Sequence, residues 1–170
     1  MGVGKTTIGK KVAAKLNRDF IDIDEQIEKE FKMPVSQIFI AYGEKVFRER
    51  EKSLITSLAE QQHKVISVGG GAFLQEEIKS ICLESCMVIF LDLSLEGWKD
   101  RIELIIDSRP VLQGKSIKEM EELFSKRQNI YVDHHLKISA DHKDAEDIAN
   151  EIVEKLISLG VRQARNSNRK

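Results

Sequence analysis

The sequence predicts an α/β fold in which a parallel sheet forms the middle of three layers, with helices on both faces. Short apolar segments typical of buried strands alternate along the chain with longer segments that repeat with the period of an α-helix. The chain has 170 residues, of which 41% are hydrophobic, and this is enough for a single core. Because no internal repeat or linker divides it, we expect one domain over residues 1–170.

The first half of the chain contains two predicted strands. Ile8, Val12 and Leu16 are four apart, which predicts a helix after residue 5. Residues 19–24 alternate polar and apolar side chains, and residues 64–68 form an apolar run that ends in glycines. The helical segments expected between these strands run through Ile27 and Phe31, over residues 35–39, and from Gly43 onward.

The second half continues the alternation. Residues 87–91 form an apolar strand, and residues 136–138 form a short last one. Further helices are expected around Trp98 and Ile102, from about Ile117 to beyond Tyr131, and through Ile148, Ile152, Leu156 and Leu159. In such a parallel sheet, ligands bind where the strands end, so polar residues at those points are site candidates.

The composition argues against several classes of function. A net charge of -1 gives no general attraction to nucleic acid. Cys82 and Cys86 are too few for a zinc site, which normally has four ligands, and they suit a reducing cytoplasm. No apolar run approaches the length of about 20 residues that spans a bilayer. We expect a cytoplasmic monomer that binds neither nucleic acid nor membrane.

A phosphate-binding loop is indicated just before the first helix. Residues 2–7 read Gly-Val-Gly-Lys-Thr-Thr and match the second half of the pattern G-x-x-x-x-G-K-[ST], although a chance turn could look the same. Glycines allow backbone N–H groups to face phosphate, Lys5 would bridge two phosphates, and Thr6 would bind Mg²⁺. The pattern's first glycine and its strand would precede Met1, so we expect the fold's first strand to be missing from this sequence.

Two carboxylates stand at the end of the next predicted strand. Asp22 and Asp24 are two apart, so on a strand both side chains would point the same way. They would then face the ligand-binding edge of the sheet. Asp24 could equally cap the following helix.

Two arginines have helical neighbours. Arg48 and Glu51 are three apart, which ordinarily indicates a surface ion pair, but Arg48 could also offer a guanidinium fork to a substrate carboxylate while Glu51 orients it. Arg127 and Tyr131 are four apart, again commonly a surface pair. The glycines at 69–71 would let a flat ligand approach the backbone closely.

In order and spacing, these segments resemble shikimate kinases over nearly the whole chain. The matching segments are residues 2–9, Phe-Ile-Asp-Ile-Asp at 20–24, Gly-Glu-x-x-Phe-Arg-x-x-Glu at 43–51, the glycines at 69–71, Arg-Pro-Val-Leu at 109–112, and Arg127 with Tyr131. The second and third segments separate this family from other P-loop kinases. The resemblance implies a P-loop NTPase fold like that of nucleoside monophosphate kinases, and transfer of phosphate from ATP to the 3-hydroxyl of shikimate, in aromatic amino-acid biosynthesis.

The resemblance also implies a role for each matching residue. ATP would be bound by Gly2, Val3, Gly4, Lys5, Thr6, Thr7 and Arg109, with Lys143 near the adenine. Mg²⁺ would be bound by Thr6 and, through water, by Asp22. Shikimate would be bound by Asp24, Arg48, Gly70 and Arg127, along a helical segment at about 25–60. The catalytic residues would be Lys5, Asp24, which accepts the hydroxyl proton, and Arg109, on a lid loop at about 107–117.

One segment departs from the family, and two other functions stay open. Residues 130–135 read Ile-Tyr-Val-Asp-His-His, where the family has Pro-Leu-Tyr followed by an acid and a small apolar pair. Another small-metabolite kinase, such as gluconate kinase, would share the phosphate loop but has no reason for Arg48 and Glu51. A nucleotide-binding module without catalysis would not need Asp24.

Overall fold

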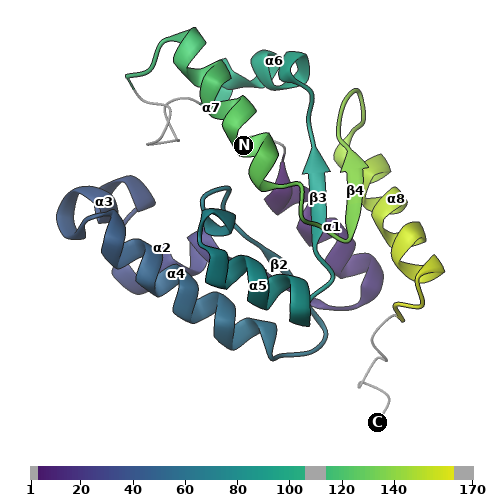
Figure 1. The fold of residues 1–170 in the computed structure, drawn as a ribbon. Coiled ribbons are helices and arrows are strands. Elements are labelled where there is room, and N and C mark those ends of the chain that lie inside the picture. Colours follow the sequence, from purple (N-terminus) through teal and green to yellow (C-terminus); the bar gives the residue numbers. More distant parts are fainter. Residues whose placement is uncertain (1–3, 106–113, 163–170) are drawn as a thin grey trace.

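The structure is a computed structural model that describes residues 4–105 and 114–162 (Figure 1). In this part the chain forms parallel strands and helices in alternation. The helices are α1 (Lys5–Leu16), α2 (Ile23–Phe31), α3 (Val35–Tyr42), α4 (Glu44–Ala59), α5 (Glu76–Ser85), α6 (Leu95–Ile105), α7 (Ile117–Ile130) and α8 (Ala145–Ser158). The strands are β1 (Asp19–Asp22), β2 (Lys64–Ser67), β3 (Ile89–Asp92) and β4 (Leu136–Ser139), with a 3₁₀ turn η1 (Ala72–Leu74).

The strands are parallel, as predicted, but they form two pairs and not the single sheet that was expected. β1 pairs with β2 from Asp19 opposite Lys64, and β3 pairs with β4 from Ile89 opposite Leu136. Among the described residues, β2 and β3 are not hydrogen-bonded to each other. A cavity of about 610 Å³ is lined by residues of both strands and by the inner face of α1. The middle layer is therefore interrupted between β2 and β3.

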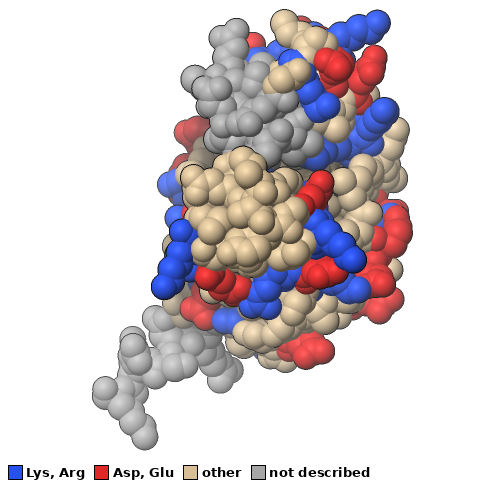
Figure 2. Space-filling model, turned by 90° about the vertical axis from the view of Figure 1, so that its left-hand side faces the viewer, with Lys and Arg blue, Asp and Glu red and all other residues tan. Residues whose placement is uncertain are grey.

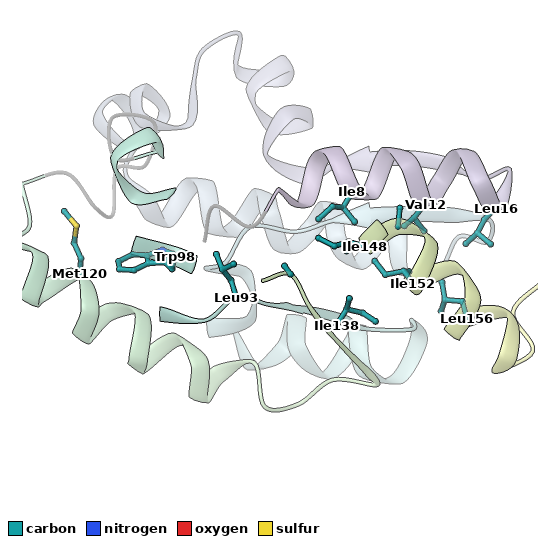
Figure 3. Close-up of a cluster of buried hydrophobic side chains, with 12 residues drawn as sticks. Ile8, Val12, Leu16, Leu93, Trp98, Met120, Ile138, Ile148, Ile152 and Leu156 are labelled. Atoms are coloured by element: carbon teal, nitrogen blue, oxygen red, sulfur yellow. The ribbon is translucent and has the colours of Figure 1, made fainter. Parts of the chain in front are cut away.

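The first core cluster holds the helix that carries the Gly-Lys-Thr segment. One face of α1 packs against one face of α8 (Figure 3). The facing side chains are Ile8, Val12 and Leu16 on α1 and Ile148, Ile152 and Leu156 on α8. Their spacing follows the helical period, and each buried aliphatic side chain of this size contributes about 1.5–3 kcal/mol. Lys11 and Lys15 add ion pairs to Glu146 at the edge of this contact.

The second core cluster holds helices α2 to α5 together, on the side of the molecule away from α8 (Figure 1). Its centre on α4 is the stripe of Phe47, Ile55 and Leu58, all buried. Glu51 lies on this same face and is 0% exposed. Burying a carboxylate among apolar side chains costs free energy unless the carboxylate is paired. The residues that pair with Glu51 are therefore candidates for the functional site.

The outer face of α3 is apolar and uncharged. Ile40 is 87% and Tyr42 53% exposed. Figure 2, which views the molecule from this side, shows an uncharged area with Lys, Arg, Asp and Glu interspersed around it. In the described part of the chain, none of the helices combines the length and apolar character that a membrane crossing requires.

Two element boundaries and one whole helix differ from the predictions. β1 ends at Asp22, and Asp24 lies in the first turn of α2, not on the strand. Tyr131 is the C-cap of α7, so this helix does not run beyond it. Helix α5 was not predicted, although its buried Ile78 and Cys82 are four apart.

Burial raises the pKa of the Cys82 thiol to about 11, and both cysteines are free.

Candidate active site

A pocket of about 160 Å³ opens where β1 and β2 end. Its residues come from the start of α1, the junction of β1 with α2, and the segment after β2. They are Lys5, Thr6, Asp22, Asp24, Glu25, Glu28, Ser67 and Gly69. The candidate phosphate-binding and acidic residues therefore meet at the carboxyl ends of parallel strands, where ligands bind in such sheets.

The Gly-Lys-Thr segment forms the N-terminus of α1. Gly4 has φ +85°, a left-handed conformation that glycine adopts without strain, and it is the N-cap of the helix. The Gly4 carbonyl already accepts the first helical bond, from Ile8 N at 3.0 Å. The N–H groups of a helix's first turn have no acceptor within the helix, and the helix dipole makes this end attractive to anions. Gly2 and Val3 lie outside the described residues, and Thr7 is exposed.

Thr6 and Asp22 are in direct contact. Thr6 Oγ1 donates a hydrogen bond to Asp22 Oδ2 at 2.7 Å, and Asp22 Oδ1 accepts one from Glu25 N at 3.2 Å. Asp22, and not Asp24, is therefore the N-cap of α2. A hydroxyl beside a carboxylate offers the hard oxygen ligands that suit Mg²⁺ when phosphates and waters complete its shell. Within the described residues, no cluster of three His, Cys, Asp or Glu could hold a metal by itself.

Asp24 lies between this pocket and a second group of charged residues. A methyl group added at Gly69 would come within 3.2 Å of Asp24 Oδ1, so the carboxylate packs directly against the glycine segment. The negative charge of Asp24 also contributes to raising the pKa of Glu51, behind the larger effect of burial. Asp24 thus lines the same pocket as Lys5 and Thr6 and is close enough to Glu51 to act on its charge.

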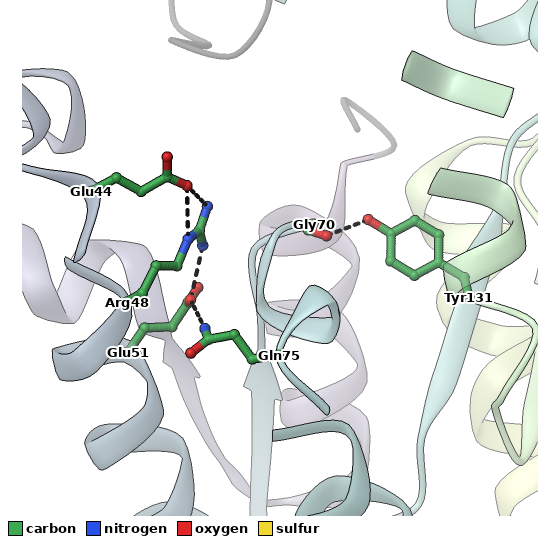
Figure 4. Close-up of polar contacts among 6 residues, drawn as sticks. All are labelled: Glu44, Arg48, Glu51, Gly70, Gln75 and Tyr131. Atoms are coloured by element: carbon green, nitrogen blue, oxygen red, sulfur yellow. Dashed lines mark hydrogen bonds and ion pairs between the residues drawn. The ribbon is translucent and has the colours of Figure 1, made fainter. Parts of the chain in front are cut away.

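Arg48 is bound by two carboxylates (Figure 4). Its Nη1 donates to Glu51 Oε2 at 2.8 Å, while Nε and Nη2 both donate to Glu44 Oε1 at 3.2 Å. Gln75 Nε2 donates to the same Glu51 oxygen at 2.9 Å. Because Glu51 is fully buried, the interpretation of Arg48 and Glu51 as a surface ion pair is wrong. Glu51 instead orients the guanidinium group of Arg48 from the buried side.

The glycine segment makes room for these side chains. A methyl group at Gly71 would lie only 2.4 Å from Arg48 Nη2, so any larger residue would displace the guanidinium. The rings of Phe39 and Phe47 flank Arg48, with centroids 5.9 and 5.3 Å from its Cζ. Such ring faces stabilise a cation and fix its plane.

Arg127 and Tyr131 approach the same segment from α7. Arg127 is only 7% exposed, so the expected surface pair is again not found. The Tyr131 hydroxyl donates to the Gly70 carbonyl at 2.6 Å (Figure 4). Burial raises the pKa of the Tyr131 phenol, and the positive charges of Arg127 and Arg48 oppose that rise. Both arginines are thus close enough to act on one phenol.

Other expected residues do not join this group, or cannot be examined. Lys143 lies between β4 and α8 and donates to Glu151 Oε2 at 2.6 Å, and it does not line the pocket. Arg109 lies outside the described residues, as does most of the loop expected at 107–117.

Sequence reasoning missed Gln75 and the contact between Tyr131 and Gly70. Gln75 carries no motif, and it follows a 3₁₀ turn whose geometry places it against Glu51. One signal was available for Glu51 itself: Phe47 and Ile55 lie four residues before and after it, so the helical stripe already places it inside.

Comparison with known proteins gives consistent results. The family model described as shikimate kinase matches residues 1–157. The chain is 58% identical to the shikimate kinase of Oceanobacillus iheyensis over 156 residues, which is 92% of this chain and 85% of that protein. It is 53% identical to the shikimate kinase of Bacillus subtilis over 157 residues, 92% of this chain and 84% of that protein.

Solved structures resemble this one closely. Shikimate kinase from Acinetobacter baumannii, in complex with shikimate, superimposes with a TM-score of 0.87 at 29% identity and covers 95% of this chain and 91% of that chain. Shikimate kinase from Aquifex aeolicus superimposes with a TM-score of 0.80 at 29% identity and covers 94% of this chain and 93% of that chain.

Proposed function

This chain belongs to the shikimate kinase family, and we propose that it transfers the γ-phosphate of ATP to the 3-hydroxyl of shikimate. The observation that carries this proposal is the position of Asp24. It lies against Gly69, shares a pocket with Lys5 and Thr6, and acts electrostatically on Glu51, the partner of Arg48. A hydroxyl held at Asp24 would face both a phosphate site and a carboxylate site.

The phosphate site would use the start of α1. Gly2, Val3, Gly4 and Thr7 would bind phosphate through backbone or hydroxyl groups, and Lys5 would neutralise the β- and γ-phosphates. Thr6 would hold Mg²⁺ directly and Asp22 through water, and the Thr6–Asp22 hydrogen bond supports this pairing. Bound there, Mg²⁺ would neutralise charge on the phosphates.

The carboxylate site would use two guanidinium groups. Arg48 is held by Glu51, and Arg127 is buried and close enough to Tyr131 to act on its phenol, which supports a role for both guanidinium groups. Gly70 would contact the ring hydroxyls through its backbone, while α2, α3 and α4 would form the substrate-binding segment at 25–60. A small anion held in this way would keep its 3-hydroxyl near Asp24.

Asp24 would act as the general base. As the hydroxyl oxygen forms its bond to the γ-phosphorus, the bond from phosphorus to the leaving ADP oxygen breaks, and the hydroxyl proton passes to Asp24. We expect Arg109, on the lid loop at 107–117, to stabilise the charge of the transferring group and to help exclude water. We assign Lys143 to the adenine, although its ion pair with Glu151 would have to open first.

We also propose that the protein works as a monomer in the cytoplasm, without a nucleic-acid or membrane partner. Two free cysteines suit a reducing compartment. Light scattering during size-exclusion chromatography would detect a dimer and refute the monomer.

The function is tested with a panel of acceptors. Purified protein with Mg²⁺ and ATP is given shikimate, gluconate or a nucleoside monophosphate, and ADP release is followed together with the phosphorylated product. We expect product only with shikimate. Preferred phosphorylation of gluconate would assign a different kinase activity, and nucleotide binding without any turnover would indicate a binding module.

A further inference from the structure

The buried carboxylate of Glu51 has a second hydrogen-bond donor outside the segment that carries Arg48. Gln75 follows the turn η1, directly after the glycines, and its Nε2 lies 2.9 Å from Glu51 Oε2. Arg48 Nη1 binds the same oxygen at 2.8 Å. Figure 4 shows Gln75 and Arg48 approaching this oxygen from opposite sides.

We propose that Gln75 is a positioning residue for the substrate carboxylate: it holds Glu51, and Glu51 in turn holds Arg48. The inference rests on the proposed function, in which Arg48 binds that carboxylate. Gln75 itself would touch neither substrate.

The burial of Glu51 explains why a second donor matters. Its side chain is 0% exposed on the apolar face of α4, where an ionised carboxylate is stable only with hydrogen-bond donors. Burial raises the pKa of the Glu51 carboxyl, while the hydrogen bonds from Arg48 and Gln75 lower it. Loss of Gln75 would therefore favour the protonated form, which is a weaker partner for a guanidinium.

Arg48 also has an alternative partner. Glu44 is exposed and already accepts hydrogen bonds from Nε and Nη2 of Arg48, both at 3.2 Å. If the Glu51 carboxylate is held less firmly, the Arg48 guanidinium can turn toward Glu44 and away from the carboxylate of the bound substrate. Gln75 thus decides how firmly Arg48 is held on the buried side.

Gln75 also ties the glycine segment to α4. Gly71 touches the Arg48 guanidinium, and Gln75 lies four residues further on. Its side-chain amide is therefore one link that keeps the segment and Arg48 in register. This predicts an effect on shikimate binding and none on ATP binding, because the expected phosphate site lies at residues 2–7, at the start of α1.

The test replaces Gln75 by Met, which has a similar shape but no donor, with Gln62→Met as an exposed control. Gln75 is only half-buried, so the variant should fold. We expect the Kd for shikimate to rise about three- to tenfold, more at about pH 6 than at about pH 8, with the KM for ATP unchanged. If Gln75 had a purely structural role, the substitution would instead lower Tm and weaken the binding of shikimate and ATP together.

The Gln75→Glu variant tests the same proposal independently. An ionised carboxyl would repel Glu51, with Asp24 nearby adding to the repulsion, whereas a protonated one can donate as the amide does. Shikimate binding by this variant should therefore improve as pH falls, the reverse of Gln75→Met.

The outcomes separate the two proposals. Wild-type turnover of shikimate, with Kd values and pH profiles unchanged in both Gln75 variants, would overturn this inference alone. A wild-type protein that neither binds nor phosphorylates shikimate would overturn the proposed function, and this inference with it. Weaker shikimate binding with opposite pH trends in the two variants would establish both.

Discussion

The hydroxyl of Tyr131 donates a hydrogen bond of 2.6 Å to the backbone carbonyl of Gly70, across 61 residues of sequence. This bond joins the end of α7 to the glycine segment that follows β2. Because the peptide unit is planar, fixing a carbonyl limits how the adjoining peptide plane can turn. Tyr131 therefore holds the orientation of the segment against which Asp24 and Arg48 pack.

Replacing Tyr131 by Phe should weaken shikimate binding without unfolding the protein. The ring would keep its packing against Phe90, and only the hydrogen bond would be lost. A net loss of about 1 kcal/mol corresponds to about a fivefold higher Kd for shikimate. Calorimetric titration measures this, with Tyr42→Phe on the exposed side of α3 as control. An unchanged Kd would mean that backbone contacts alone fix the segment.

Replacing Arg48 or Arg127 by Lys should affect shikimate far more than ATP. Lysine keeps the charge but loses the planar fork, and in Arg48→Lys the buried Glu51 would also lose the hydrogen bond from Nη1. We expect a loss of about 2 kcal/mol or more in shikimate binding. Arg50→Lys is the matched control, because Arg50 is on the same helix but pairs with Glu30 near the surface. Equal shikimate affinity in all three variants would remove both arginines from the carboxylate site.

Replacing Asp24 by Asn should sharply reduce turnover and leave Tm nearly unchanged. An amide cannot accept the hydroxyl proton, so kcat should fall by about 10²-fold or more. Stability should hold because Asp22 supplies the cap of α2. Asp22→Ala, by contrast, should lower Tm, since Asp22 caps α2 and losing a cap costs about 1 kcal/mol. Near-normal kcat together with a lowered Tm in Asp24→Asn would assign Asp24 to structure.

The local sequence pattern predicted most of the helices and strands and the residues of the pocket. It did not predict the hydrogen bonds that orient the site residues. Asp22 and Asp24 were expected together on a strand. They reach the same pocket in a different way, because capping by Asp22 starts α2 immediately after β1. The strand pairing could not be predicted, since short apolar runs do not specify their neighbours. The hydrogen bonds from Gln75 to Glu51 and from Tyr131 to Gly70 depend on how segments distant in the sequence pack together. The spacing of residues along the chain does not predict such packing.

The last prediction concerns the attachment of α1, which begins at Lys5, to α8. Lys11 Nζ lies 2.8 Å from Glu146, and Lys15 also pairs with it. Hydrogen bonds from Lys11 and Lys15 lower the pKa of Glu146 to about 2. Because the pKa is lower in the folded protein, this contribution to stability is present above the unfolded value of about 4.5 and is lost as pH falls toward about 2.

Glu146→Gln should therefore lower Tm at about pH 7, and the difference from wild type should shrink steadily between about pH 4.5 and pH 2. It should also shrink in high salt, because the groups are accessible to solvent and are screened. Glu154→Gln, on the exposed face of the same helix, should show no such trend. Melting curves of both variants at each pH measure it. A Tm difference that is constant across this range would mean that Glu146 stabilises the α1–α8 contact through packing and not through charge.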